Sequence, residues 1–153
     1  MGIRAMRDLR IQREDFDPGA EIEALASSNS GQTGAIASFI GLVRGDDGMT
    51  AMTLDYYPGM SEREIASRVA QAKSRWPLIA VRVVHRFGRL TPGERIVFVG
   101  VASSHRAAAF EAAEFLMDYL KTQAPFWKLE ERPSGTSWVE ARVQDDESLK
   151  RWR

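Results

Sequence analysis

The sequence predicts an α+β fold, in which helices pack on a mixed or antiparallel sheet within one domain spanning residues 1–153. Three observations lead to this class. A chain of 153 residues with 44% hydrophobic content can bury one proper core and leaves little room for a second. Strand-like and helix-like segments mix without the strict alternation of a doubly wound parallel fold. No repeat or low-complexity segment divides the chain.

The N-terminal half predicts three strands and two helices. Residues 9–12 favour a short strand, and residues 18–28 a helix with Asp17 as N-cap and Pro18 at the first helical position. Residues 33–44 and 51–57 are rich in β-branched and aromatic side chains, and the turn signal at 45–48 predicts that they pair as strands. Ser61 followed by Glu64 is a capping-box pattern, which predicts a helix that Pro77 ends.

The C-terminal half predicts two central strands and a long helix. Residues 78–87 and 95–102 are apolar strands around a turn at 91–94. Ser103 or Ser104 can cap a helix over 105–122, which Pro125 ends, and residues 137–143 favour a last strand after a loop at 133–135. The apolar stripe of the helix is expected from four residues at helical spacing: Phe110, Ala113, Met117 and Leu120.

Composition excludes several classes of protein. Lys plus Arg total 21 and Asp plus Glu total 21, so no excess positive charge attracts nucleic acid or an anionic membrane. The sequence has no long uncharged apolar stretch and no signal peptide pattern, so a cytoplasmic protein is expected. With no cysteine and two histidines, neither a thiolate nor a metal site is indicated, and no cofactor is expected.

The lysines are few and unevenly placed. Four of the 21 basic residues are lysines, which leaves 17 arginines, and two of the lysines, Lys121 and Lys128, lie seven positions apart. Lysine can lose its proton and arginine effectively cannot, so this pair indicates a need for amines. Lys121 lies at the edge of the apolar stripe of the helix and is expected to be half-buried. The alternative to a functional amine is a side chain whose stem covers core surface and whose amine complements the helix C-terminus. The alternative for Lys128 is an outward side chain beside Phe126 and Trp127, which pack over a sheet edge.

The start of the same helix carries a second cationic group. His105 and Arg106 lie at the helix N-terminus, where the helix dipole disfavours positive charge. A phosphate or carboxylate bound there would be favoured by the dipole and would neutralise the two cationic side chains. The alternative is that both side chains are solvated or paired with a nearby acid. The other histidine, His85, alternates with Val84 and Arg86 in a strand-like run and is expected to be structural.

Five segments carry a resemblance to a known family. They are TGAIASFIGLVR, LDYYPGMSE, RWPLIAVRVVHRFGRLTPGE, VASSHRAAAFEAAEFLMDYLKTQAPFWK and WVEAR. In this order and spacing they resemble the molybdopterin synthase catalytic subunit family over nearly the whole chain, most specifically over residues 103–128. The first few residues lie outside the resemblance, and Leu129, where relatives often carry a charge, departs from it.

The resemblance implies an α/β hammerhead-type fold and a sulfurtransferase of molybdenum cofactor biosynthesis. It implies a homodimer in which each copy binds a small ubiquitin-like carrier, giving a heterotetramer. The carrier's C-terminal Gly-Gly thiocarboxylate would enter the active site and supply sulfur to cyclic pyranopterin monophosphate, forming the dithiolene of molybdopterin. The absence of cysteine agrees with an imported sulfur source.

The resemblance also implies roles for individual residues. Lys121 and Lys128 are the expected catalytic residues, as acid or base or as stabilisers of developing oxyanions. The expected substrate-binding residues are Phe39, Arg44, His105, Arg106, Met117 and Arg142. On one continuous helix His105 and Lys121 would lie about 24 Å apart, too far for one pterin to reach both. We therefore expect each site to combine residues of two subunits.

Two other classes compete with this enzyme. One is a non-catalytic α+β module that binds a phosphorylated metabolite or a peptide tail through the same cations, although such a module in an arginine-rich chain would be expected to use arginine throughout. The other, a nucleic-acid-binding protein, is suggested by four tryptophans and many arginines but opposed by the zero net charge.

Overall fold

Two four-stranded sheets and four α-helices make up the part of the chain that the computed structural model describes, residues 8–29, 31–139 and 143–152. The helices are α2 (Pro18–Ala26), α3 (Met60–Arg75), α4 (Arg106–Thr122) and α5 (Val143–Lys150). The strands are β1 (Leu9–Gln12), β2 (Ala35–Leu42), β3 (Ala51–Tyr56), β4 (Leu78–Arg86), β5 (Gly88–Leu90), β6 (Arg95–Ser103), β7 (Phe126–Arg132) and β8 (Gly135–Val139). The predicted α+β class is confirmed.

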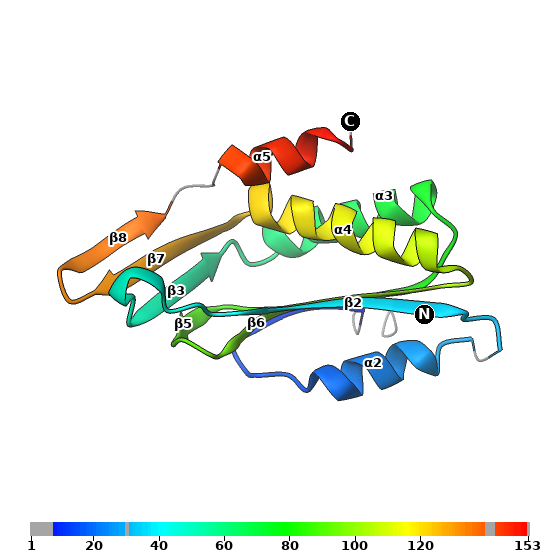
Figure 1. The fold of residues 1–153 in the computed structure, drawn as a ribbon, viewed down its shortest axis with the longest axis horizontal. Helices are drawn as coiled ribbons and strands as arrows, with labels where there is room; N and C mark the ends of the chain where they lie inside the picture. Colours follow the sequence, from blue (N-terminus) through cyan, green and yellow to red (C-terminus); the bar gives the residue numbers. More distant parts are fainter. Residues whose placement is uncertain (1–7, 30, 140–142, 153) are drawn as a thin grey trace.

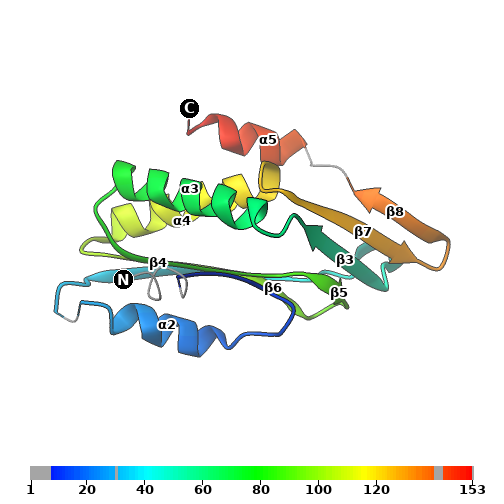
Figure 2. The ribbon, with the colours of Figure 1, turned by 180° about the vertical axis from the view of Figure 1, so that it is seen from behind.

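The first sheet has the strand order β1-β4-β6-β2 and is covered on both faces. Helices α3 and α4 lie on one face and α2 on the other (Figures 1 and 2). Side chains of β6 alternate between the two cores: Val97 and Val99 face α3 and α4, whereas Phe98 and Ala102 belong to the core beneath α2. This alternation follows from the period of two along a strand. β1 is parallel to β4 and the other pairs are antiparallel, so the predicted mixed sheet is confirmed.

A glycine lets α2 approach the sheet. A Cβ atom added at Gly100 would lie 2.4 Å from Cδ1 of Leu25, a fully buried residue of α2. Any larger residue at position 100 would push the helix away. At its other end α2 begins as predicted, because the Asp17 carboxylate accepts a hydrogen bond from the backbone N–H of Gly19 at 3.0 Å.

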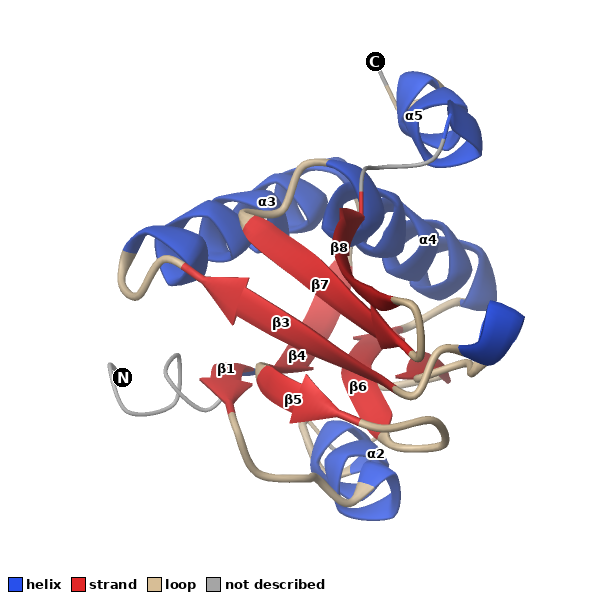
Figure 3. Cartoon of the chain, turned by 90° about the vertical axis from the view of Figure 1, so that its left-hand side faces the viewer, coloured by secondary structure: helices blue, strands red, loops and turns tan. Residues whose placement is uncertain are grey.

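The second sheet has the strand order β5-β3-β7-β8 and extends beyond α3 and α4 at one end of the molecule (Figure 1). In the view from that end, its strands lie in front of those of the first sheet (Figure 3). Phe87 joins β4 to β5. β5 begins at Gly88, which has a φ of +96° that only glycine adopts readily. A small core of its own contains Val43, Met49, Met52, Leu54 and Leu90. The predicted pairing of residues 33–44 with 51–57 is wrong, because β2 pairs with β6 and β3 pairs with β5 and β7.

The end of the chain also differs from the prediction. The segment FWKLEER forms β7, which has no strong strand pattern and is held by its partners β3 and β8. The predicted last strand, 137–143, is confirmed at 137–139, which belong to β8; residues 140–142 lie outside those described, and Val143 begins α5, which was not predicted. Because pairing with β3 joins residues about 75 positions apart in sequence, no local signal could predict this strand.

Two helix starts and one helix face also need correction. α3 begins at Met60 after Gly59, whose N–H donates to Glu62 at 3.1 Å, so the predicted Ser61 and Glu64 capping box is wrong. α4 follows His105 as its N-cap, with no serine cap. Its buried face is Ala109, Ala112, Ala113, Phe115, Leu116 and Tyr119, and Phe110 is 65% exposed rather than part of the stripe.

Candidate functional site

The unbroken helix α4 separates the two predicted cationic groups. His105 is its N-cap and Lys121 lies in its last turn, so the predicted continuous helix is confirmed. The strand register agrees: Ala35 pairs with Ser103 at the His105 end of the sheet, whereas Leu42 pairs with Arg95 at the opposite end. A small ligand bound at one end therefore cannot touch the other end of the same chain.

Lys121 is exposed in this chain, so the predicted half-burial is wrong. The last turn of α4 places its amine beside the unsatisfied helix carbonyls, where a cation is favoured. Its ammonium also lies near the buried side chain of His85, whose pKa it helps to lower. The amine is therefore open to a ligand while its surroundings include a fixed aromatic ring.

Lys128 lies on β7, opposite Leu54 of β3 and Val139 of β8, and is half-buried. The two residues before it are packed, but they belong to the inner strand β7 and do not lie over a sheet edge as predicted. Trp127 contacts Tyr57 with ring centroids 4.5 Å apart, and Phe126 stacks on His85 at 3.9 Å. The second predicted catalytic residue is thus held on a central strand of the second sheet.

A short connection joins the two lysines. Residues 122–127 are the only ones between them in the sequence. Within this connection, the backbone oxygen of Pro125 accepts a hydrogen bond at 2.9 Å from the hydroxyl of the fully buried Ser61. The lysines are brought to one end of α4, where the first sheet meets the second. The structure therefore supports a shared neighbourhood for the two amines.

His105 and Arg106 are exposed at the other end of α4. The N-cap makes no side-chain hydrogen bond, and the first turn contains no acidic residue. The free N–H groups and two cationic side chains remain suited to an anion. The anion site at the start of α4 stays a prediction.

The other predicted substrate-binding residues are dispersed. Arg44 follows β2 at the Lys121 end of the first sheet and forms an exposed ion pair with Asp46, Nε to Oδ2 at 2.5 Å. Phe39 is 40% exposed on β2, and Met117 is half-buried against the core beneath α3 and α4. Arg142 lies outside the described residues.

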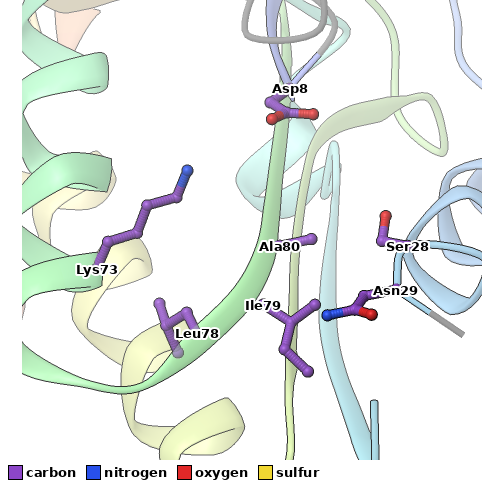
Figure 4. Close-up of a pocket in the computed structure, with 7 residues that line it drawn as sticks. All are labelled: Asp8, Ser28, Asn29, Lys73, Leu78, Ile79 and Ala80. Atoms are coloured by element: carbon purple, nitrogen blue, oxygen red, sulfur yellow. The ribbon is translucent and has the colours of Figure 1, made fainter. Parts of the chain in front are cut away.

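Two hollows in the described part of the chain lie away from these residues. The larger, about 580 Å³, is lined by Asp8, Ser28, Asn29, Lys73 and residues 78–80 (Figure 4). The smaller, about 210 Å³, lies among Arg68, Phe115, Gln123 and Trp152. Neither hollow is lined by a predicted site residue.

No group of three or more His, Asp or Glu side chains among the described residues could hold a metal ion. None of the helices described is long and apolar enough to cross a membrane.

Sequence reasoning missed two features of this region. His85 was expected to be structural, and it is buried and hydrogen-bonded, but its place beside Lys121 has no local signal. The open edge of β2 was also missed. β2 is the outer strand of the first sheet, and exposed apolar side chains lie along it and on α4: Phe39, Ile40, Leu42 and Phe110.

Comparisons with known proteins identify the family to which the chain is similar. The family model described as MoaE protein matches residues 11–123. A molybdopterin synthase catalytic subunit from Mesorhizobium japonicum is 53% identical over 148 residues, covering 95% of this chain and 92% of that protein.

Solved structures give the same result. The molybdopterin biosynthesis MoaE protein from Burkholderia ambifaria is 51% identical with a TM-score of 0.83, covering 96% of this chain and 98% of that one. Molybdopterin synthase from Staphylococcus aureus is 28% identical with a TM-score of 0.79, covering 88% and 98%. Together with the fold and the placement of the lysines, these likenesses establish that the chain belongs to the MoaE protein family, whose relatives are molybdopterin synthase catalytic subunits.

Proposed function

We propose that this chain transfers sulfur from the thiocarboxylate of a small carrier protein to cyclic pyranopterin monophosphate, using Lys121 and Lys128. A sulfurtransferase role in molybdopterin biosynthesis follows from the family. The observation that carries the proposed site is that Lys121 and Lys128 are joined by one short, packed connection. Both lie at the C-terminal end of α4, and Lys121 is the only lysine within that helix.

The amines suit the charges that such a reaction develops. When the carrier's thiocarboxylate sulfur displaces an oxygen from a side-chain carbon of the pterin, negative charge develops on the departing oxygen, as in ring opening of the cyclic phosphate. Water then attacks the thioester that results, which places negative charge on the acyl oxygen, leaves the sulfur on the pterin and returns the carrier as a carboxylate. An ammonium group stabilises these oxyanions, and an amine that exchanges its proton can act as acid or base. The 17 arginines elsewhere could bind anions but could not exchange protons at neutral pH.

The sulfur must come from another molecule. The chain has no cysteine, so it cannot carry a persulfide. The open surface around Lys121 leaves room for an extended peptide tail, whose terminal thiocarboxylate is the sulfur donor that we propose. The partner is then a small ubiquitin-like protein ending in Gly-Gly. We place this reaction in the cytoplasm, as the composition suggests.

A second copy of the chain would complete each site. The edge of β2 and the exposed side chains of Phe39, Ile40, Leu42 and Phe110 form an apolar surface that a two-fold partner can cover. In such a dimer His105 and Arg106 of one copy would serve the site that contains Lys121 and Lys128 of the other. This accounts for two cationic groups at opposite ends of one helix.

Turnover tests the proposed reaction. Purified chain is mixed with thiocarboxylated carrier and pterin precursor, and the product is oxidised to its fluorescent form and quantified. We expect product only when all three components are present. A chain that binds the precursor and the carrier but yields no product would instead be the binding module that the sequence left open.

Subunit mixing tests the shared site. At a precursor concentration well below the weakened affinity of Arg106→Ala, the Lys121→Ala and Arg106→Ala chains are each expected to have little activity alone. After subunit exchange about half of the dimers are mixed, and each mixed dimer has one intact site, so about a quarter of wild-type activity should return. No recovery in samples with proven mixed dimers would show that each site lies within one chain.

A further inference from the structure

The buried ring of His85 has a fixed orientation. It lies on β4 on the same face as Val81 and Val83, beneath α3 and α4, and is 7% exposed. Its Nδ1 is 2.8 Å from the backbone carbonyl oxygen of Arg86. A carbonyl oxygen can only accept, so Nδ1 carries the proton and Nε2 keeps its lone pair. The main chain therefore selects one tautomer.

The ring supports the connection between the two lysines. It stacks on Phe126 with centroids 3.9 Å apart and planes 16° from parallel. Phe126 also stacks on Tyr56 of β3 at 6.1 Å, and the preceding Pro125 is held by Ser61 of α3. The start of β7 and the residue before it are therefore held by contacts with β4, β3 and α3, and His85 of β4 provides the contact from the first sheet. Since this connection joins Lys121 to Lys128, its position sets where the two amines lie.

The ring also adds no charge at this place. Burial lowers the pKa of His85 to about 4, the Arg86 carbonyl opposes this, and the Lys121 ammonium lowers the pKa further. The imidazole is therefore neutral at neutral pH. A neutral ring can sit under a cationic group, whereas a second buried cation would repel it.

We propose that His85 is a positioning residue for the amines of Lys121 and Lys128: its neutral ring, oriented by Arg86 and stacked on Phe126, holds the α4–β7 connection against the first sheet. His85 acts through Phe126 and its surroundings, and no contact with a substrate is required. The consequence for catalysis rests on the proposed function, in which these amines act on the reacting groups.

Two replacements of His85 separate its contacts. His85→Phe keeps a ring that can stack on Phe126 and loses the Nδ1 hydrogen bond. His85→Asn keeps a donor near the Nδ1 position and loses the stack. Val84→Ala is the matched control, because Val84 is the neighbouring buried residue, 1% exposed, and points into the core beneath α2. It shortens a buried side chain of the same strand without touching the lysine connection.

The small number of lysines permits a readout that needs no substrate. Reductive methylation with ¹³C-formaldehyde labels the amines of Lys73, Lys121, Lys128 and Lys150, and single Lys→Arg variants assign their NMR signals. We expect His85→Asn to shift the Lys121 and Lys128 signals and to leave those of Lys73 and Lys150 unchanged. His85→Phe should shift Lys128 less than His85→Asn does, and Val84→Ala should shift none.

Kinetics give the second readout. Relative to wild type, His85→Asn should lower kcat by about tenfold to a hundredfold with a smaller change in KM, because misplaced amines act on the reacting groups and less on binding. His85→Phe should recover part of this loss. A purely structural histidine would lower the unfolding temperature in both variants and leave lysine signals and kcat like those of Val84→Ala.

The outcomes separate this inference from the proposed function. Unchanged Lys121 and Lys128 signals in a folded His85→Asn chain, or equal shifts in Val84→Ala, would overturn the positioning role even if wild type turns over. If His85→Asn does not fold, His85→Leu decides, because it fills the buried space and removes the aromatic stack on Phe126: unchanged Lys121 and Lys128 signals would overturn the role and shifted ones would support it. A wild type that makes no product would overturn the proposed function, while the lysine signals would still decide the role of His85.

Discussion

The two ends of α4 carry similar cationic side chains in different surroundings. At the C-terminal end, the connection after Lys121 is packed by His85, Tyr56 and Ser61 from three different elements. At the N-terminal end, His105 and Arg106 are exposed, and the helix start has neither a side-chain cap nor an acidic residue in its first turn.

The difference indicates which end is complete within one chain. Groups that act on reacting atoms must be held in place, and packing supplies this at the Lys121 end. Groups that bind a mobile anion need exposure and free N–H donors, which the His105 end provides. The first end therefore fits chemistry, and the second fits recognition of a phosphate.

The largest expected effect is on the Lys121 end. Lys121→Ala and Lys128→Ala should each lower product formation by about a hundredfold or more, because each removes an amine proposed to act in the reaction. Lys73→Ala and Lys150→Ala are matched controls, since they remove the chain's other two lysines, both exposed. Fluorescence of the oxidised product measures the rate, and circular dichroism checks the fold. Near wild-type turnover by a folded Lys121→Ala or Lys128→Ala chain would remove that lysine from the mechanism.

The buried His85 should make the free energy of unfolding depend on pH. The pKa of His85 is about 4 in the folded chain and about 6.5 when unfolded, so the unfolded state binds the extra proton between these values. Stability present above pH 6.5 should be lost as the pH falls toward 4, by about 3 kcal/mol. Urea unfolding across this range measures it.

The control for this pH effect is His85→Phe, which has no group to titrate. The difference in unfolding free energy between wild type and this variant should shrink or change sign as the pH falls from 6.5 to 4. A constant difference would mean that His85 does not couple folding to protons.

A smaller effect is expected at the exposed end. Arg106→Ala should weaken precursor binding by about tenfold to a hundredfold, the cost of losing a charge-assisted hydrogen bond to phosphate, with little change in carrier binding. Arg63→Ala, another exposed arginine, is the control. Calorimetry with each ligand measures both affinities. Equal losses for precursor and carrier would contradict an anion site at the start of α4.

The smallest expected effect concerns the surface between copies. Phe110→Asp should raise the dimer dissociation constant by about tenfold or more by placing a charge on the proposed apolar interface. Trp138→Asp is the control, because Trp138 is similarly exposed, at 64%, but lies on β8 in the second sheet. Sedimentation velocity measures both. A Phe110→Asp chain that dimerises like wild type would place the interface elsewhere.

The sequence by itself determined the local features of this protein. The class of fold, the Asp17 cap of α2, the strands β4 and β6 and the length of α4 follow from side-chain periodicity and helix-end signals, which act over a few residues. The separation of His105 from Lys121 also follows, because it depends only on the rise of one helix. The lysine pair was visible because composition and spacing are properties of the sequence alone.

Only the tertiary structure decided which of these elements meet. β7 forms because β3 and β8 pair with it. Phe110 is exposed because another face of α4, with its alanines and larger side chains, packs on the sheet. His85 lies near Lys121 because β4 pairs with β6, the strand on which α4 packs. Each of these depends on contacts between residues far apart in the sequence, and their free energy comes from burial that no local pattern encodes. For the same reason the surroundings of the two lysines, and with them the proposed role of His85, could be found only in the folded chain.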